Sequence, residues 1–266
     1  SGMMTADPRL VNNIKHIPQI SYQEAMELSH FGAKVIYPPT IQPVMKKGIP
    51  VWIKNTFAPE EPGTVIKNEA TATGTSIQGI SSINSIVFLS LEGSGMVGIP
   101  GFSKRLFEAL ANASINVILI TQGSSEHSIC VGVDEYASAK AKEVIDAAFA
   151  YEIETNKVDP IIVEKELSIV AIVGDNMKNH SGISGKMFSA LGRNGVSIRA
   201  IAQGSSERNI SAVISTADVK KAINVLHEEF FETTYKQVNL FIGGLGNVGQ
   251  KFLDQLQQQK QFLLEK

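Results

Sequence analysis

Apolar and polar residues follow two alternating periods through the middle of the chain. Residues 86–91 form a short apolar run, residues 102–113 are apolar at every third or fourth position, and residues 115–120 form a second run. Apolar residues then alternate with others over residues 129–133 and return to the helical spacing over residues 137–148. Short apolar or alternating runs predict strands, and the 3.6-residue period predicts helices. The predicted order is strand, helix, strand, strand, helix.

An apolar stretch at residues 161–163 predicts a fourth strand, which completes the βαββαβ order of a ferredoxin-like unit over residues 84–166. The same outline returns 81 residues later, since residues 87–149 align without gaps to residues 168–230 with 18 identities in 63 positions. A fixed offset of this kind indicates an internal duplication. We therefore predict a second unit over residues 167–235.

The predicted fold is α+β, with two tandem units that each have a four-stranded antiparallel sheet and helices on one face. The second unit lacks an obvious fourth strand, and we expect the apolar run at residues 238–242 to complete or pad its sheet. Residues 67–83 include a stretch rich in Thr, Ser and Gly and predict a linker. Residues 1–66 and 236–266 flank the regions described so far.

A glycine-rich loop joins the first strand to the first helix of each unit, over residues 93–101 and 174–182. Such a loop lets a ligand approach the backbone, and the helix N-terminus behind it favours a carboxylate. Gln122 and Gln203, which open a repeated Gln-Gly-Ser-Ser-Glu segment, end the second strand of their units. A primary amide both donates and accepts hydrogen bonds, so a small amino acid would satisfy these groups. A polar turn without a ligand is the alternative.

A dinucleotide-binding fingerprint follows the second unit. The apolar run at 238–242, the spacing Gly244-x-Gly246-x-x-Gly249 and an amphipathic helix over residues 250–263 come in the order that binds a pyrophosphate. The acidic residue that holds the ribose belongs about 20 positions further on, and the sequence ends 17 residues after Gly249. We therefore expect a tight turn before a helix here, with no bound dinucleotide.

Composition argues against several classes of function. Lys and Arg number 24 and Asp and Glu 26, a net charge of −2, which argues against nucleic acid or an anionic membrane as the main partner. The sequence has no run of about 18 apolar residues, so we predict no membrane span. Cys130 is the single cysteine, so we expect no disulfide framework, no structural metal site and a cytoplasmic protein.

The repeated units resemble the paired ACT domains of aspartokinases, and the whole chain resembles the bifunctional aspartokinase–homoserine dehydrogenase family. Both units carry that family's Ile-x-Gln pattern, as Ile120-Thr121-Gln122 and Ile201-Ala202-Gln203. Tyr37 and Pro39 depart from the family's usual His and Arg. Further matches are MTADPR at residues 4–9, SYQEAMELS at 21–29, FGAKVIYP at 31–38, PVWIKNT at 50–56 and the glycine fingerprint at 244–249.

The resemblance implies a kinase that uses ATP with Mg and a dehydrogenase that uses NADP or NAD, both regulated by threonine bound at the ACT units. It also implies a homodimer or higher homo-oligomer formed through those units. The matching residues imply a nucleotide site of the kinase at Thr5, Asp7, Pro8 and Arg9, and a cofactor site of the dehydrogenase at Gly244, Gly246, Asn247, Val248 and Gly249. They imply an effector site at Gln122, Gln203, Ile120, Ile201, Asn116, Gly93, Met96, Gly101, Gly174, Met177 and Gly182.

The kinase's N-terminal half and the dehydrogenase's substrate residues have no counterpart in residues 1–266. We therefore expect this chain alone to be catalytically inactive and to bind none of those cofactors. Three alternatives remain open: an ACT module that pairs chains without sensing a ligand, an aspartokinase region that senses lysine, and an enzyme fragment that still binds nucleotide through residues 4–9 or 244–249.

Overall fold

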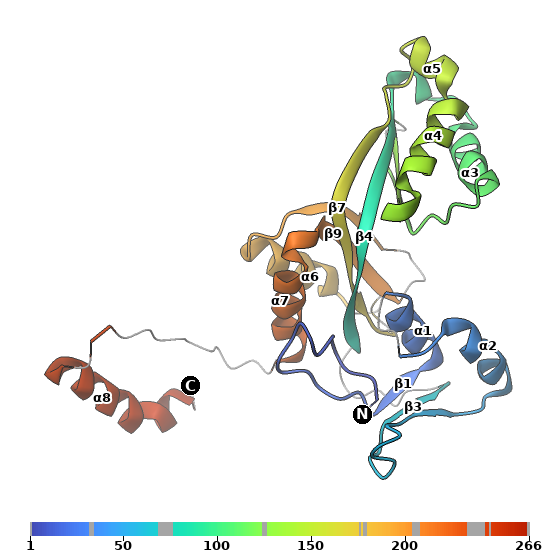
Figure 1. Cartoon of the computed structure of the whole chain (residues 1–266). Coiled ribbons are helices and arrows are strands. Elements are labelled where there is room, and N and C mark those ends of the chain that lie inside the picture. The colour runs from blue at the N-terminus through green and yellow to red at the C-terminus, as the bar shows by residue number, and fades with distance from the viewer. Residues whose placement is uncertain are drawn as a thin grey trace. The chain divides into compact units, whose positions relative to one another are not determined.

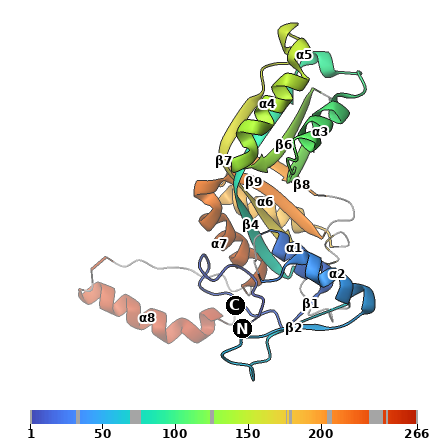
Figure 2. The same ribbon diagram turned by 45° about the vertical axis from the view of Figure 1, so that its right-hand side comes forward.

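Two long strands, β4 (Gly79–Glu92) and β7 (Ile162–Val173), run antiparallel side by side through both halves of a six-stranded sheet (Figures 1 and 2). The chain divides into two units, Ser1–Phe231 and Glu232–Lys266, and each is described by itself. The structure is a computed structural model that describes residues 2–31, 35–68, 77–123, 127–175, 177, 180–203, 208–232, 243–244 and 246–264.

The strand order of this sheet is β5-β6-β4-β7-β9-β8, with every neighbouring pair antiparallel. A ferredoxin-like unit places its strands side by side in the order fourth, first, third, second. The first half has this order as β7-β4-β6-β5, and the second half has it as β4-β7-β9-β8. Helices α3 and α4 cover one half and α6 and α7 cover the other (Figure 2). The predicted α+β fold is therefore confirmed. The remaining elements are the 3-10 helix Ser94–Met96, α3 (Phe102–Asn112), β5 (Leu119–Gln122), β6 (Ser128–Asp134), the 3-10 helix Glu135–Ala137, α4 (Ser138–Ala148), α5 (Ala150–Glu154), α6 (Ile183–Arg193), β8 (Ile198–Ala202), β9 (Asn209–Ser215), the 3-10 helix Thr216–Asp218 and α7 (Val219–Phe231).

The fourth strand of the second half comes from the start of β4, ahead of the first unit in the sequence. Residues 79–83 pair with residues 169–173 of β7, and Ile80 is buried under the helices of the second half. This corrects the predicted linker, which included residues 79–83. The run at residues 238–242 expected to complete this sheet lies outside the described residues. The first unit is thus inserted into the second, rather than simply preceding it.

Both long strands change register where the two halves meet. Ser85 in β4 and Glu166 in β7, which are equivalent in the repeat, have positive φ angles of 61° and 59°. The pairing of β4 with β7 shifts between Ile83 and Ile86. A bulge of this kind changes which alternate residues face a given side of the sheet, so one continuous strand can serve the cores of both halves.

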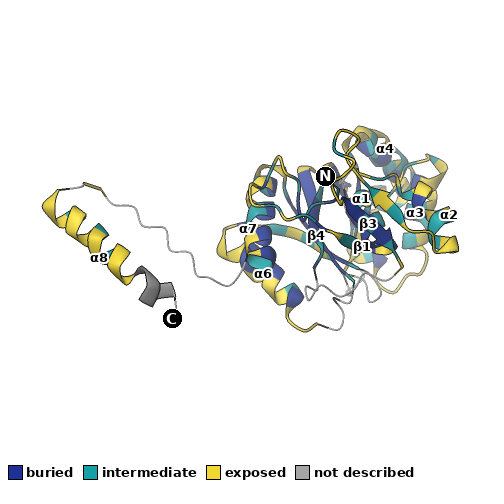
Figure 3. Cartoon of the chain, turned by 90° about the horizontal axis from the view of Figure 1, so that it is seen from below, coloured by how far each residue is buried: buried dark blue, intermediate teal, exposed yellow. Residues whose placement is uncertain are grey.

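Three buried apolar clusters hold the larger unit together, and Figure 3 shows the buried residues along the strands and on the inner faces of the helices. One cluster fills the space between α3, α4 and the first half of the sheet, with Leu106 and Leu110 at its centre. The second lies under α6 and α7 and also takes in Ala6 and Val11 from the N-terminal segment. Burying apolar side chains is the main stabilising contribution, so this segment belongs to the core of the second half.

The N-terminal segment also forms a small sheet of its own. Strand β1 pairs in parallel with β3, and β2 pairs antiparallel with it. Helix α1 begins with a capping box, in which the Ser21 hydroxyl accepts from the Glu24 backbone and the Glu24 carboxylate accepts from the Ser21 backbone. These elements are β1 (Gln19–Ser21), α1 (Tyr22–His30), α2 (Pro38–Lys47), β2 (Val51–Ile53) and β3 (Thr64–Lys67).

The smaller unit contains α8 (Asn247–Leu264), which begins within the glycine fingerprint. Its described side chains are mostly exposed (Figure 3). Across the described residues, no helix is both long and apolar enough to cross a membrane.

Candidate functional site

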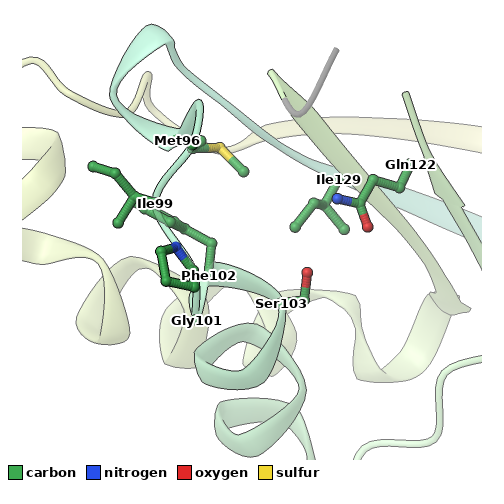
Figure 4. Close-up of a pocket in the computed structure, with 9 residues that line it drawn as sticks. Met96, Ile99, Gly101, Phe102, Ser103, Gln122 and Ile129 are labelled. Atoms are coloured by element: carbon green, nitrogen blue, oxygen red, sulfur yellow. The ribbon is translucent and has the colours of Figure 1, made fainter. Parts of the chain in front are cut away.

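A pocket opens where the end of β5 lies beside the start of α3. Gln122 ends β5, and Ser103 lies in the first turn of α3. Figure 4 shows the Gln122 amide and the Ser103 hydroxyl both directed into the space between strand and helix. The cavity volume is about 280 Å³, which suits a ligand of a few heavy atoms. Its lining residues are Met96, Gly98, Ile99, Pro100, Gly101, Phe102, Ser103, Gln122 and Ile129.

The polar groups of this pocket come from a helix N-terminus and from two side chains, Ser103 and Gln122. The N-cap residue of α3 is Gly101, whose φ of 108° is one that side chains rarely adopt. The first turn of a helix has backbone N–H groups without intrahelical partners, and these favour a carboxylate. Gln122 offers both a donor and an acceptor. None of the described lining residues is charged.

The second unit repeats the serine and the glutamine. The Ser184 hydroxyl donates a 2.9 Å hydrogen bond to the Gln203 side-chain oxygen. Ser184 is the repeat equivalent of Ser103, and Gly182 again caps the helix with a positive φ of 89°. The described parts of both units therefore place a serine of the helix beside a glutamine at the end of β5 or directly after β8.

Ser103 and Ser184 are absent from the residues proposed on sequence grounds. A signal for them exists in the sequence, because this serine is identical in both copies and lies two positions after the repeated glycine of the loop. That signal is weak, since a helix residue faces a ligand only at the right rotation about the helix axis, which the repeat does not give. Ser124, Ser125 and Glu126 of the first pentad lie outside the described residues.

Several other candidates lie close to the first pocket or at the equivalent place in the second unit. Met96 lines the first, and both Met96 and Met177 are buried, so they belong to the core below the loops. Ile120 is two residues before Gln122 and thus on the same face of β5, where it is half exposed. Ile201 is half exposed in β8 in the same way.

Gly93, Gly174 and Asn116 are not among the residues that line the first pocket. A Cβ on Gly93 would lie 2.4 Å from the Lys157 carbonyl oxygen, so this glycine allows close backbone packing. The Gly174 N–H donates to the Arg208 carbonyl oxygen at 2.9 Å. Asn116 is exposed and precedes β5, at the opposite end of that strand from Gln122.

One ion pair lies directly behind the first pocket. The Arg105 guanidinium of α3 donates to both carboxylate oxygens of Glu152 and stacks on the Phe149 ring, 4.6 Å from its centroid. Hydrogen bonding to Arg105 holds the pKa of Glu152 below its usual range. This pair fixes α5 against α3 at the back of the pocket.

The proposed nucleotide residues of the kinase separate into two groups. Asp7 accepts hydrogen bonds from the Arg9 guanidinium, which lowers the pKa of Asp7, and both line a groove of about 530 Å³ together with Pro8. Thr5 is buried instead, with its hydroxyl oxygen 2.9 Å from His227 Nε2 of α7. Thr5 therefore connects this segment to the second half of the large sheet.

Two glycines of the fingerprint in the smaller unit lie close together in a turn before α8. Gly244 has a φ of 98°, and a Cβ on Gly249 would lie 2.5 Å from the Gly244 carbonyl oxygen. Gly246 precedes α8, which starts at Asn247, and Val248 is exposed. The strand expected before it, at 238–242, lies outside the described residues. Among the described residues, no group of three or more His, Cys, Asp or Glu side chains could hold a metal ion.

Comparison with known proteins identifies these units. Residues 89–149 and 170–230 match the ACT domain, and residues 1–55 match the amino acid kinase family. The chain is 43% identical over its whole length to the bifunctional aspartokinase/homoserine dehydrogenase of Haemophilus influenzae, of which it covers 32%. The chain contains the regulatory ACT region of an aspartokinase-type protein. It spans about a third of the length of the curated relatives it matches.

Solved aspartokinases share the arrangement of ACT units and kinase segment. The aspartate kinase of Clostridium acetobutylicum superposes with a TM-score of 0.78 and 32% identity, over 86% of this chain and 52% of that one. E. coli aspartokinase III in complex with lysine and aspartate, in its T-state, superposes with a TM-score of 0.70 and 28% identity, over 87% of this chain and 50% of that one. From here on, the half of the sheet with α3 and α4 is the first ACT unit, and the half with α6 and α7 is the second.

Proposed function

We propose that the two ACT units bind threonine and thereby regulate the kinase and dehydrogenase activities of a bifunctional aspartokinase/homoserine dehydrogenase. The observation that carries this proposal is the serine–glutamine pair at a helix N-terminus, present in both units. An ordinary polar turn has no reason to preserve a serine on the helix as well as a glutamine on the strand.

In the proposed complex, the α-carboxylate of the amino acid accepts hydrogen bonds from the first-turn N–H groups of α3 or α6. The side-chain oxygen of Gln122 or Gln203 accepts a hydrogen bond from the ammonium group of threonine, and the side-chain nitrogen donates one to the threonine hydroxyl. Ser103 and Ser184 hold the amide or contact the ligand directly, as the hydrogen bond from Ser184 to Gln203 supports. Ile129 and Met96 pack against the methyl group in the first unit.

Threonine is favoured over lysine by the chemistry of the first pocket. An extended lysine side chain would place a second ammonium group in or beside it, and buried charges need a partner. The described lining residues offer no carboxylate. The whole-length similarity to bifunctional relatives points the same way, whereas the lysine complex of aspartokinase III supports lysine as the second candidate.

The whole protein would then carry out two reactions. In the kinase, Asp7, Pro8 and Arg9 would take part in holding ATP with Mg, and in the dehydrogenase residues 244–249 would hold NADP or NAD. The positive φ of Gly244 and the close approach at Gly249 fit a pyrophosphate loop. We further propose a cytoplasmic homo-oligomer formed through the ACT units, in which threonine shifts the population of kinase conformations.

Calorimetric titration of residues 1–266 with threonine tests the effector and its site. We expect heat of binding with threonine, and its loss from one unit in Gln122→Ala and from the other in Gln203→Ala. Heat with lysine but not threonine would keep the site and change the effector. Heat with neither amino acid, together with a dimer whose sedimentation threonine leaves unchanged, would favour an association module instead.

A further inference from the structure

The loop that precedes α6 in the second ACT unit is tied to helix α1, which belongs to the segment that matches the amino acid kinase family. The backbone N–H of Asp175 donates a 2.7 Å hydrogen bond to one oxygen of Glu24. The other oxygen of Glu24 accepts from the Ser21 backbone at 3.1 Å. Glu24 is 1% exposed. One buried carboxylate therefore caps α1 and holds the effector loop.

A second contact follows one turn along α1. The Asn209 side-chain amide donates to the Glu27 carboxylate at 2.9 Å. Residues three apart lie on the same face of a helix, so Glu24 and Glu27 face the second unit together. Between their two partners, the Arg208 guanidinium binds the Asp175 side chain, and the Arg208 carbonyl oxygen accepts from the Gly174 N–H. Arg208 directly precedes β9, in which Asn209 pairs with Val173 and Ser211 pairs with Ala202, so this cluster lies close to the end of β8 that Gln203 follows.

The first ACT unit holds its loop from within. The Gly93 N–H donates to the His127 carbonyl oxygen at 3.0 Å, which is the repeat equivalent of the bond from Gly174 to Arg208. The Gly95 N–H, however, donates to the Lys157 carbonyl oxygen at 2.9 Å, in the segment after α5. Serines take the places of Asp175 and Asn209 in this unit. Among the described residues, the two hydrogen bonds to α1 thus come from the second unit, although residues of both units share an apolar cluster with α1.

We infer that Glu24 is a positioning residue of the second effector site, and that ligand binding there is coupled to the docking of α1. The inference rests on the proposed function. The loop that leads into α6 begins at Gly174, and Glu24 fixes the N–H of its next residue, Asp175. Coupling between two sites is reciprocal, so an amino acid bound in the second unit must also stabilise α1, while one bound in the first unit need not.

The test isolates each site in residues 1–266 with threonine as the probe. In a Gln122→Ala background only the second site is left, and we expect Glu24→Ala to weaken threonine binding there by about tenfold or more, within the usual range of coupling. In a Gln203→Ala background only the first site is left, and the same Glu24→Ala change should alter its affinity by less than about twofold. Equal weakening at both sites, or at neither, would overturn the inference.

Two further variants separate positioning from simple loss of structure. Glu24→Gln keeps an oxygen that can accept from Asp175 and should retain most of the affinity. Ser21→Ala removes the hydroxyl of the capping box but leaves Glu24, so it should weaken α1 and reduce threonine binding at the second site much less than Glu24→Ala does. If Ser21→Ala weakens binding as much as Glu24→Ala, stability of α1 explains the effect and the inference is wrong.

Amide hydrogen exchange gives a readout that needs no substitution at Glu24. Threonine should slow exchange in residues 22–30 of the unsubstituted chain and of Gln122→Ala, but not of Gln203→Ala. Slowing that persists in Gln203→Ala would overturn the inference. If the unsubstituted chain binds no threonine, the proposed function fails first and the inference fails with it. Binding without the dependence on Glu24 or Gln203 defeats the inference alone.

Discussion

The two ACT units share the proposed effector site and differ in what supports it. Both place a serine of the helix near a glutamine of the strand, and both cap the helix with a glycine of positive φ. Behind the first site lie α5 and the pair of Arg105 with Glu152, whereas Glu24 of α1 holds the loop of the second. Duplication thus copied the chemistry, and the different surroundings give each copy a different neighbour to influence.

Topology reinforces this difference. Residues 79–83 supply the fourth strand of the second unit and follow the N-terminal segment directly, so the second unit is linked to that segment both covalently and through a common core. The first unit is inserted between β4 and β7. Comparing equivalent substitutions in the two units therefore tests whether one of them is the mechanical neighbour of the kinase segment.

Removal of a buried leucine from each unit should have the largest effect. Leu110 and Leu191 are repeat equivalents, each 1% exposed or less. Leu→Ala at such sites costs about 2–5 kcal/mol, since a cavity is added to the lost burial. We expect both variants to lose that much in denaturant unfolding. Only Leu191→Ala should also speed hydrogen exchange in residues 2–17, because Ala6 and Val11 share its cluster.

Leu110→Ala serves as the matched control for that measurement. If it opens residues 2–17 as much as Leu191→Ala does, the larger unit unfolds as one body. The proposed difference between the two ACT units would then have no basis in local stability.

Much of this arrangement follows from the sequence, because the repeat carries it. Elements that recur at one offset, such as the strand with Gln122 and the strand with Gln203, can be assigned to a ferredoxin-like unit from the amino-acid pattern alone. That the fourth strand of the second unit comes from residues 79–83 could not be predicted in this way. Residues 79–83 and 238–242 are both short apolar or mixed runs, and pattern alone does not say which one a sheet edge will take.

The contact of Glu24 with Asp175 also could not be predicted from the sequence. The capping box of Ser21 and Glu24 is a local pattern, yet one oxygen of that carboxylate is used 151 residues away in the chain. Contacts of this kind depend on how separate elements pack. The serines of the helix were closer to being predictable, since their identity in both copies was visible.

Acid titration should give a smaller effect, with opposite signs at Glu24 and Glu152. Burial raises the pKa of Glu24, so its contribution to stability is present below the ordinary glutamate value of about 4.3 and is lost as the pH rises through the raised pKa. The pKa of Glu152 is lowered by Arg105, so its contribution is present above that ordinary value and is lost as the pH falls through the lowered pKa.

The substitutions Glu24→Gln and Glu152→Gln each remove one of these titrations, so they make both pH dependences of stability measurable. Relative to the unsubstituted chain, Glu24→Gln should gain stability as the pH is raised above about 4.3, whereas Glu152→Gln should gain as the pH is lowered below it. Urea unfolding across this pH range reports both slopes. Slopes of the same sign would show that burial does not dominate at Glu24, and that the supports of the two loops differ less than their contacts indicate.

The smallest expected effect compares the turns that end α3 and α6. Ser114 and Gly195 are repeat equivalents with φ angles of 55° and 66°, and the following N–H in each turn bonds back to Leu110 or Leu191 at 3.0 Å. A left-handed backbone costs an L-residue about 1–2 kcal/mol, while glycine's greater freedom in the unfolded chain offsets about 0.4–1 kcal/mol of that. Ser114→Gly should therefore stabilise the first unit by about 0.5 kcal/mol, and Gly195→Ser should destabilise the second by a similar amount. Thermal unfolding of both variants measures this. If Ser114→Gly is neutral while Gly195→Ser is costly, the two turns are not energetically equivalent despite their shared backbone, and the difference between the units extends beyond the loops to the far ends of their helices.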